Sequence, residues 1–265
     1  MSLPEYEIFA IKYGDRVGNR GSIFVHGDPH EAPLAMDYFV WVIRNADRTV
    51  VLDIGFSESE GKRRKRNCLR CPADSLKLVG VDPDTVEHVI ISHMHYDHVG
   101  NMEKFPRATF HIQDEEMGFV TGRAMTHPPL RHSFVLSEVV NMVSALYGDR
   151  VVFHDGDEEV FPGISVHHMP GHTRGLQSVR VHTKRGWVVL ASDAAHYYES
   201  ITEGTPFMTH ENLFLMLESF RKLRKLAVDD RHIVPGHDPL VMKRYPAPSP
   251  DLEGIVIRLD VAPSE

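Results

Sequence analysis

A dense group of potential metal ligands follows the apolar run 89–91. It contains His93, His95, Asp97 and His98, three imidazoles and a carboxylate within six positions. His93 and His95 are two positions apart, so on extended backbone their side chains point the same way and can bind one ion. Imidazole with carboxylate suits zinc, with cobalt, iron and manganese as alternatives. The competing interpretation, four polar residues in a solvated loop, does not explain why a buried strand delivers them together.

Three more candidate ligands come later, each at the end of an apolar run or in the turn beyond it. His172 lies in the segment 170–173, Asp193 follows the run 187–190, and His237 follows the run 232–234. Loops at the ends of sheet strands are where rigid folds present functional side chains. We therefore expect a sheet to hold these residues in place.

The whole pattern resembles the HxHxDH signature of the metallo-β-lactamase superfamily, and the later His, Asp and His match the rest of that family's ligand set. The resemblance implies an α+β fold, the four-layer αβ/βα sandwich of that family. It also implies two divalent metal ions per chain, zinc first, with iron, cobalt or manganese as alternatives. The residues implied are His93, His95 and His172 for one ion, Asp97, His98 and His237 for the other, and Asp193 for both.

The same resemblance implies a hydrolase. A hydroxide shared by the two ions would attack a carbonyl, because the pKa of water on such a metal falls from about 15.7 to about 7. One ion would polarise that carbonyl, and the other would accept the departing oxygen. Asp97 lies next to the nucleophile, and we hypothesise that it also passes a proton to the leaving oxygen.

The segments 92–101, 192–194 and 234–238 look most like those of the quorum-quenching N-acyl-homoserine lactonases. That likeness predicts a small-molecule substrate, a lactone with an apolar tail. The alternative is a thioesterase of the glyoxalase II type, or a hydrolase of another lactone or carboxylic ester. Zinc β-lactamases typically have cysteine where this chain has Asp193. A non-hydrolytic metal-binding or redox protein is the third class. Di-iron oxidoreductases of the fold usually replace one ligand of the first motif with Glu, whereas this chain keeps His95.

One departure from the lactonase pattern concerns a substrate-binding hydroxyl. Those lactonases often have a tyrosine three residues after the bridging aspartate, and this chain has His196 there, followed by Tyr197 and Tyr198. Either tyrosine would serve if the loop differs by one residue, and His196 would otherwise replace it. All three stay open as catalytic candidates, and Tyr197 is slightly preferred. The alternative for two adjacent tyrosines is that they are half-buried packing residues.

The elements that must position these residues are mostly strands. β-rich runs at 6–11, 38–43, 49–53 and 110–113 predict strands, and Asp114 starts a predicted helix. Residues 72–79 predict a short helix, 151–189 a meander of short strands, and 211–227 an amphipathic helix. Asp53 ends a strand in an element that resembles the family's "DTG", where the aspartate accepts a hydrogen bond from a metal-bound histidine.

Length and composition limit the domain organisation, the location and the partners that the protein could have. The 265 residues include 42% apolar residues and show no linker, which predicts a single domain over 1–265 with a substrate-pocket insertion at about 116–150. The sequence contains no run of 18 apolar residues, so it predicts no membrane span. No secretory signal is visible either, and we therefore expect a cytoplasmic protein. The net charge of −8 argues against nucleic acid as a partner. A homodimer remains one alternative for its assembly.

Two further groups of metal-binding residue types are expected to lie outside the site. Cys68 and Cys71 form a single CxxC after the basic run 62–66, without a second pair to complete a zinc site, which predicts a reduced, solvated surface loop. His167 and His168 precede His172, but adjacent strand residues point to opposite faces. We expect neither of them to be a ligand.

Overall fold

The structure is a computed structural model that describes residues 3–28, 30 and 33–264. Two sheets lie face to face at its centre. The larger one runs in the order β13 (Val256–Arg258), β1 (Glu7–Asn19), β2 (Pro33–Arg44), β3 (Thr49–Leu52), β5 (His88–Ile90), β6 (Thr109–Gln113) and β7 (Val151–His154), with β4 (Asn67–Cys68) paired to β1. The smaller one runs β12 (Ile233–Pro235), β11 (Gly186–Ser192), β10 (Gln177–Thr183), β9 (Ile164–His168) and β8 (Glu158–Phe161).

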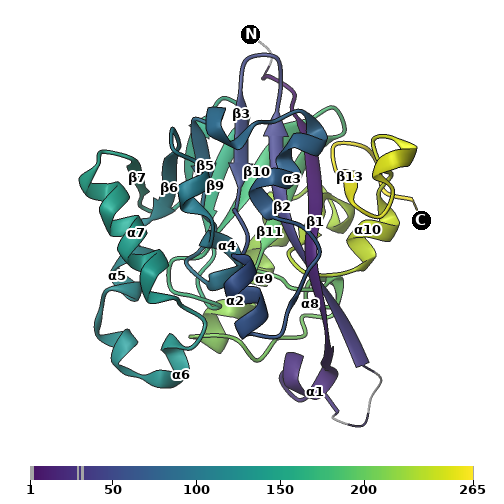
Figure 1. Cartoon of the computed structure of the whole chain (residues 1–265). Coiled ribbons are helices and arrows are strands. Elements are labelled where there is room, and N and C mark those ends of the chain that lie inside the picture. Colours follow the sequence, from purple (N-terminus) through teal and green to yellow (C-terminus); the bar gives the residue numbers. More distant parts are fainter. Residues whose placement is uncertain (1–2, 29, 31–32, 265) are drawn as a thin grey trace.

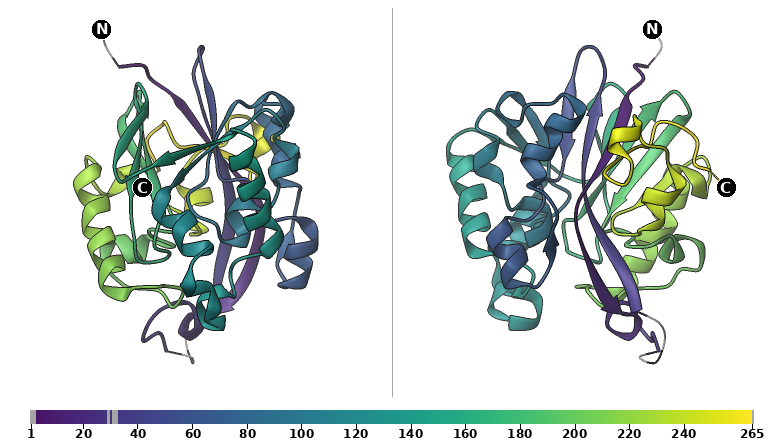
Figure 2. Two further views of the ribbon diagram at one scale, coloured as in Figure 1. Left: turned by 90° about the vertical axis from the view of Figure 1, so that its left-hand side faces the viewer. Right: turned by 45° about the vertical axis from the view of Figure 1, so that its right-hand side comes forward.

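Helices cover the outer face of each sheet, so the chain forms four layers (Figures 1 and 2). Beside the larger sheet lie α2 (Glu58–Arg63), α3 (Pro72–Ser75), α4 (Tyr96–Val99), α5 (Asp114–Val120), α6 (Pro128–Arg131) and α7 (Leu136–Tyr147). Beside the smaller sheet lie α8 (Tyr198–Thr202), α9 (Leu213–Leu226) and α10 (Leu240–Arg244), and the single turn α1 (Arg20–Ile23) lies at the far end of the β1–β2 ribbon. This is the αβ/βα sandwich that the family resemblance predicted.

The remaining helical turns are short 3₁₀ segments. They are η1 (Leu76–Val79), η2 (Pro83–Thr85), η3 (Met102–Lys104), η4 (Arg123–Thr126), η5 (Asp230–His232) and η6 (Pro250–Leu252). The predicted helix at 72–79 is thus α3 continued by η1. Among the residues that the structure describes, no helix is both long and apolar enough to cross a membrane.

The core lies between the two sheets. Strand β2 is buried from Met36 to Ile43, and every residue of that stretch except Asp37 is apolar, as expected for a strand that is covered on both faces. Trp41, Tyr13 and Phe110 are among the largest side chains with almost no exposed surface. This rigid interior fixes the edge of the sheets at which the candidate ligands lie.

Parallel pairing decides where that edge is. β3, β5, β6 and β7 run parallel in the larger sheet, and β11 and β12 run parallel in the smaller one. The carboxyl ends of parallel strands meet at the same edge, where the following loops can present side chains to one ligand. Both parallel groups place candidate ligands directly after their strands.

Three expectations about elements were wrong. Residues 151–189 are not one meander, because β7 pairs with β6 in the larger sheet and only β8–β11 form an antiparallel meander. The basic run 62–66 is not a loop throughout, since α2 extends to Arg63. Cys68 lies in strand β4, which pairs with β1, and both cysteines are free and half-buried rather than in an exposed loop.

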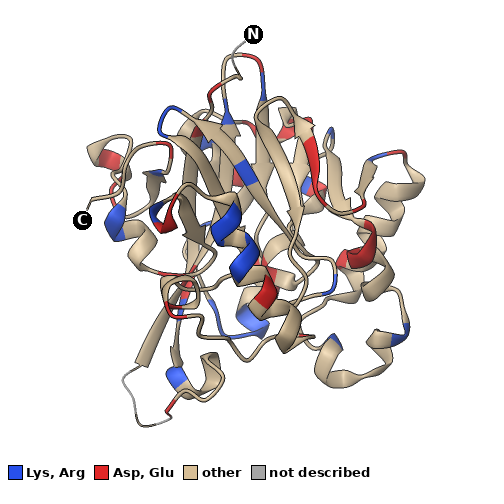
Figure 3. Cartoon of the chain, turned by 180° about the vertical axis from the view of Figure 1, so that it is seen from behind, with Lys and Arg blue, Asp and Glu red and all other residues tan. Residues whose placement is uncertain are grey.

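Acidic and basic residues are not separated from one another along the chain as seen from behind. Figure 3 shows Lys and Arg interspersed with Asp and Glu in this view, with basic positions along the helix α9. Basic residues in the last turn of α9 include Arg224 and Lys225, where they interact favourably with the negative end of the helix dipole. These charges therefore have a structural explanation within the helix itself.

Candidate metal centre

The first four candidate ligands lie just beyond the end of β5. That strand ends at Ile90, so His93 and His95 lie in the loop that follows it and not in the strand. The chain then turns into α4, which presents Asp97 and His98 from its single turn. All four side chains are buried.

Close backbone packing holds this loop against the loop after β3. The N–H of Gly100 donates to the carbonyl of Gly55 at 2.7 Å, and a Cβ added at Gly100 would lie 2.8 Å from that same oxygen. A side chain at this position would force the two loops apart. The glycine that follows the motif is therefore required for the close approach.

The other three candidate ligands come from the smaller sheet. His172 lies in the turn between β9 and β10, Asp193 follows β11, and His237 follows β12. Ser192, directly before Asp193, has a φ of 46°, a left-handed conformation that is strained for a residue other than glycine. Such strained positions gather at functional sites, where the surrounding structure compensates for their cost.

Three imidazoles converge in the first cluster. Nε2 of His172 lies 3.1 Å from Nε2 of His93 and 2.9 Å from Nδ1 of His95. Asp97, His98 and His237 form a second cluster whose ligand atoms also lie within 4.8 Å of one another. These are the two ligand triads that the resemblance implied. We call them the first triad (His93, His95, His172) and the second triad (Asp97, His98, His237).

Asp193 lies between the two triads. Its Oδ2 is 3.2 Å from Nε2 of His172 and 3.8 Å from Nε2 of His93. Its Oδ1 is 3.0 Å from Nε2 of His237 and 3.4 Å from Nε2 of His98. Each carboxylate oxygen thus faces a different triad, which is the position that a bridging ligand needs.

Several atoms of the centre lack hydrogen-bond partners among the described residues. Nε2 of His98 and Oδ1 of Asp193 are buried without a hydrogen-bond partner, although Nε2 of His237 lies 3.0 Å from that oxygen. Buried polar atoms are rarely left unpaired, because losing water without a replacement is costly. Divalent metal ions bound by these nitrogen and oxygen atoms would satisfy them, so the residues present fit two such ions.

The opposite ring nitrogens are held by other parts of the chain. Nδ1 of His172 donates to the carbonyl of Thr209 at 2.7 Å, and Nδ1 of His237 donates to that of Asp37 at 2.8 Å. Asp53 accepts from Nδ1 of His98 at 2.7 Å, as the sequence predicted. These bonds fix the tautomer that leaves each Nε2 free to bind a metal.

The electrostatics of the first triad favour metal binding. Burial, reinforced by the neighbouring imidazoles, holds the pKa of His93 and that of His95 well below their usual value. Burial would raise the pKa of Asp193, but His237, His196 and His98 outweigh it and hold that pKa well below the usual value. Neutral imidazoles beside an ionised carboxylate are the protonation states that a metal requires.

In the second triad the pKa values of the histidines are raised instead of lowered. Burial lowers the pKa of His98, but Asp193, Asp53 and Asp97 outweigh it and raise that pKa well above its usual value. The pKa of His237 is also raised, because Asp193 and Asp97 outweigh the effect of burial. A proton or a metal cation thus compensates the concentrated negative charge at this end of the centre.

Of the three catalytic candidates after Asp193, only His196 lies at the centre. Its Nε2 lies 2.9 Å from Oδ2 of Asp193, and its ring stacks on Phe207 at a centroid distance of 3.6 Å. Burial outweighs the influence of Asp193 and lowers the pKa of His196 to about 3, so the neutral ring donates this hydrogen bond. His172, Asp193 and His196 also form a further cluster with metal-ligand spacing.

The two tyrosines that follow make other contacts. The hydroxyl of Tyr197 donates to the carbonyl of Ala35 at 3.1 Å. Tyr198 starts α8, its hydroxyl has no partner among the described residues, and the guanidinium of Arg244 lies 4.0 Å from its ring centroid. Both rings also border a separate, mostly apolar cavity beside Leu240.

His167 and His168 contact residues outside the two triads. Nδ1 of His167 lies 2.9 Å from Oδ2 of Asp157, and Nε2 of His168 donates to the carbonyl of Arg174 at 2.8 Å. Neither belongs to a cluster of potential ligands among the described residues. The expectation that they are not ligands agrees with these contacts.

Apart from Asp53, sequence reasoning did not find the residues that support the centre from a distance. Tyr13 donates from its hydroxyl to the carbonyl of Asp97 at 2.8 Å, and the buried carboxylate of Glu116 accepts from the backbone of Met94. Thr209 lies 37 positions from the histidine that it holds. No local signal marks these residues, because only the folded chain brings them to the ligands.

A cavity of about 70 Å³ adjoins the first triad. His95 and His172 form its inner wall, and the rest comes from two segments, residues 119–134 and 208–211. Its apolar lining is Phe119, Pro129, Leu130, Phe134 and Met208. The predicted pocket segment at about 116–150 thus contributes one wall of this cavity.

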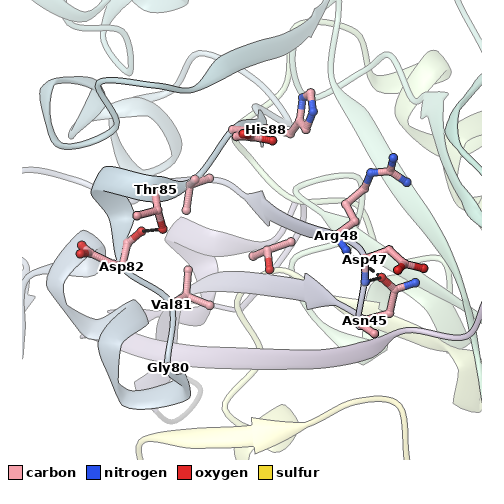
Figure 4. Close-up of a pocket in the computed structure, with 12 residues that line it drawn as sticks. Asn45, Asp47, Arg48, Gly80, Val81, Asp82, Thr85 and His88 are labelled. Atoms are coloured by element: carbon pink, nitrogen blue, oxygen red, sulfur yellow. Dashed lines mark hydrogen bonds between the residues drawn. The ribbon is translucent and has the colours of Figure 1, made fainter.

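A larger cavity of about 370 Å³ lies at the opposite ends of the same strands (Figure 4). It is lined by the turn 45–48 and by His88 at the start of β5, whereas the candidate ligands follow the end of that strand. Its polar groups serve the local turns: Asn45 accepts from the backbone of Arg48, and Thr85 donates to the carbonyl of Asp82. This cavity is therefore separate from the metal centre.

Two packed sheets with seven His and Asp side chains at one edge define the chain as an αβ/βα sandwich with a candidate two-metal centre. Residues 36–237 match the Metallo-beta-lactamase superfamily, and the chain belongs to that family.

The chain is similar in sequence to an N-acyl homoserine lactonase. An N-acyl homoserine lactonase from a Bacillus species is 31% identical over 165 residues, which are 62% of this chain and 60% of that protein. The chain therefore matches only about three fifths of that relative's length.

Two solved structures share the fold. An N-acyl homoserine lactone hydrolase with the product N-hexanoyl-L-homoserine at its catalytic metal centre gives a TM-score of 0.76 at 22% identity, covering 92% of this chain and 96% of that chain. A dizinc quorum-quenching lactonase in complex with a product gives a TM-score of 0.70 at 19% identity, covering 90% of each chain.

Proposed function

We propose that this protein is a metal-dependent hydrolase that opens the ring of N-acyl-homoserine lactones. The observation that carries the proposal is the position of Asp193, whose two oxygens face the two triads. The lactonase names of the relatives and the apolar cavity beside the first triad support the choice of substrate. Divalent ions held by the two triads, zinc first, would polarise the ester carbonyl and supply a nucleophile at neutral pH.

The residues of the chain have separate tasks in this reaction. Asp97 lies 3.8 Å from Nε2 of His98 and 3.9 Å from Nε2 of His237, so its carboxylate faces the proposed site of the second ion. From there it can accept the proton that the attacking nucleophile releases and pass it to the ring oxygen as the ester bond breaks. His196 keeps the carboxylate of Asp193 in its bridging orientation through the 2.9 Å contact.

The cavity beside the first triad would hold the acyl tail. Each methylene that it buries contributes about 0.8 kcal/mol, so binding should improve with chain length until the cavity is full. The rim includes Met208, a flexible apolar side chain that is 51% exposed. Such side chains adapt to tails of different length.

A substrate panel on protein of measured metal content tests the proposal. We expect kcat/KM on acyl-homoserine lactones to exceed that on β-lactams and phosphodiesters by several powers of ten. It should rise with the length of the acyl chain. A glutathione thioester that reacts faster than every lactone would reject the proposal in favour of a thioesterase.

A pair of matched variants tests the position of the tail. Leu130→Phe narrows the cavity, so the preferred chain should become shorter. Leu136→Phe makes the same change at a side chain of α7 that is 80% exposed, and it should leave the preference unchanged. Equal chain-length profiles for both variants and the unmodified protein would place the tail elsewhere.

A further inference from the structure

We infer that Glu116 is a positioning residue for the first triad, joining the two loops that carry its histidines. The inference rests on the proposed two-metal centre and does not depend on which substrate the enzyme takes. Glu116 is the third residue of α5 and its side chain is fully buried. It is not itself a potential ligand in any of the clusters found among the described residues.

The carboxylate of Glu116 accepts three hydrogen bonds from two separate loops. Its Oε1 accepts from the backbone N–H of Met94 at 2.8 Å, and Met94 lies between His93 and His95. Its Oε2 accepts from the hydroxyl of Thr173 at 2.7 Å and from the N–H of Gly175 at 3.0 Å. Thr173 directly follows the third histidine of the triad. One side chain thus fixes the relative position of all three imidazoles.

The backbone of Glu116 is packed tightly against the loop that carries His172. A Cβ added at Gly175 would lie 2.0 Å from the backbone nitrogen of Glu116 and 2.6 Å from its Cβ. The loop that carries His172 is therefore pressed directly against the first turn of α5. A shift of either element would move the histidine relative to the other two.

A different carboxylate supports the second triad. Asp53 accepts from Nδ1 of His98 at 2.7 Å, and also from the N–H of Ser92 at 2.7 Å. Glu116 makes none of its three hydrogen bonds to Asp97, His98 or His237. The hydrogen bonds of Glu116 are thus confined to the loops of the first triad. Asp53 contacts His98 directly and reaches His93 only through Ser92, whose hydroxyl donates to Asp53 and lies 3.0 Å from Nδ1 of His93.

The amide of glutamine cannot replace this carboxylate. Glutamine has one acceptor oxygen and one NH₂ group, and both carboxylate oxygens of Glu116 face a backbone N–H. Either orientation of the amide would point its NH₂ at an N–H that has no other partner. Glu116→Gln keeps the size of the side chain but leaves one buried N–H unpaired.

Titration of metal-free protein with Co²⁺ alone measures the effect on each triad separately. In a His237→Ala background the first triad is intact, and adding Glu116→Gln should weaken Co²⁺ binding by about 10- to 100-fold, the usual effect of losing a residue that orients a ligand. In a His172→Ala background the second triad is intact, and the same substitution should change affinity by less than about 3-fold. Glu115→Gln, at the exposed neighbouring position, is the matched control in both.

Equal weakening in the two backgrounds would show a general structural role and overturn the inference. Unchanged affinity in the His237→Ala background would overturn it as well. Thr173→Val removes one of the three hydrogen bonds and keeps the shape of the side chain, so it should weaken Co²⁺ binding in that background by about 2- to 10-fold. If Glu116→Gln does not fold, an unaffected Thr173→Val variant would still reject the inference. Failure of the unmodified protein to hydrolyse lactones would reject the proposed substrate and leave these metal affinities unaffected.

Discussion

At the scale of single residues, the centre uses its carboxylates for different purposes. Asp193 faces both triads, Asp53 orients a ligand, and Glu116 joins two loops. Asp97 is the one of these that belongs to a triad, and the proposed reaction also assigns it a proton transfer. Its backbone is held by the hydroxyl of Tyr13.

The role of Asp97 leads to the first prediction. Asp97→Asn keeps the size of the side chain but removes its charge and its ability to accept a proton. We expect turnover on the best lactone to fall by at least about 100-fold, the scale of a lost general acid or base. Steady-state kinetics with parallel metal analysis would measure this.

The control for this variant is Asp114→Asn, at an exposed carboxylate in the first turn of α5. It should behave like the unmodified protein. Near-normal turnover of Asp97→Asn with both metals bound would remove Asp97 from the chemistry.

The second prediction separates the role of His196 from that of Tyr197. Tyr197→Phe removes a hydroxyl that bonds to the carbonyl of Ala35, so turnover should change by less than about 3-fold. His196→Phe keeps an aromatic ring against Phe207 but loses the contact with Asp193, and it should reduce both metal content and turnover. Elemental analysis and kinetics of the two variants would check this. A large loss with Tyr197→Phe alone would instead favour a tyrosine that contacts the substrate.

The sequence predicted the ligands better than their supports. Each of the seven ligands follows an apolar run, and their types and order match a known motif, so the two triads could be predicted. In the sequence Glu116 looks like an ordinary acidic residue near the start of a helix. Such residues are common there because they interact favourably with the helix dipole. Its real partners, Met94 and Gly175, are 22 and 59 positions away in the chain. No pattern within a short window contains that information.

At the scale of elements, the same limit explains the wrong placement of β7. A short apolar strand such as Val151–His154 fits a parallel or an antiparallel neighbour equally well. Its partner is β6, which ends 38 positions before β7 begins. The antiparallel β8–β11 region was easier to predict, because short turns connect neighbouring strands there.

Helix α7 carries a buried acid that predicts a pH effect on stability. Glu138 is 6% exposed, and burial, together with Glu60 and Asp97, raises its pKa to about 8. The unfolded chain has an ordinary carboxyl pKa near 4.3, so the folded state binds the proton more tightly. The stability that this provides is complete below about pH 4 and is lost as pH rises through about 8.

Glu138→Gln should remove this dependence. We expect the variant to be more stable than the unmodified protein at pH 9 and to lose less stability between pH 6 and pH 9. Thermal unfolding followed by circular dichroism across this range would measure it. Glu115→Gln, which changes an exposed acid of α5, should leave the pH dependence of stability unchanged. Parallel curves for Glu138→Gln and the unmodified protein would show that Glu138 ionises normally.

At the scale of the whole molecule, the centre joins the two sheets. The larger sheet supplies His93, His95, Asp97 and His98 from the segment after β5, and the smaller sheet supplies His172, Asp193 and His237 from its turns. Each triad contains ligands from both sheets. Metal ions bound there would therefore link the two halves of the fold as well as serve the chemistry.

That arrangement leads to the last prediction. Freshly purified protein should contain about two equivalents of transition metal, and a chelator should abolish activity and lower the melting temperature. An ion present at 1,000 times its dissociation constant stabilises the folded state by about 4.1 kcal/mol. In a chain of this size each kcal/mol corresponds to about 2–4 °C, so each ion lost should lower the melting temperature by roughly 10 °C, and loss of both ions by roughly 20 °C. His237→Ala, which removes one ligand of the second triad, should lose one equivalent and show only part of this shift on chelation. One tightly bound equivalent in the unmodified protein, with no second after supplementation, would contradict the two-metal centre.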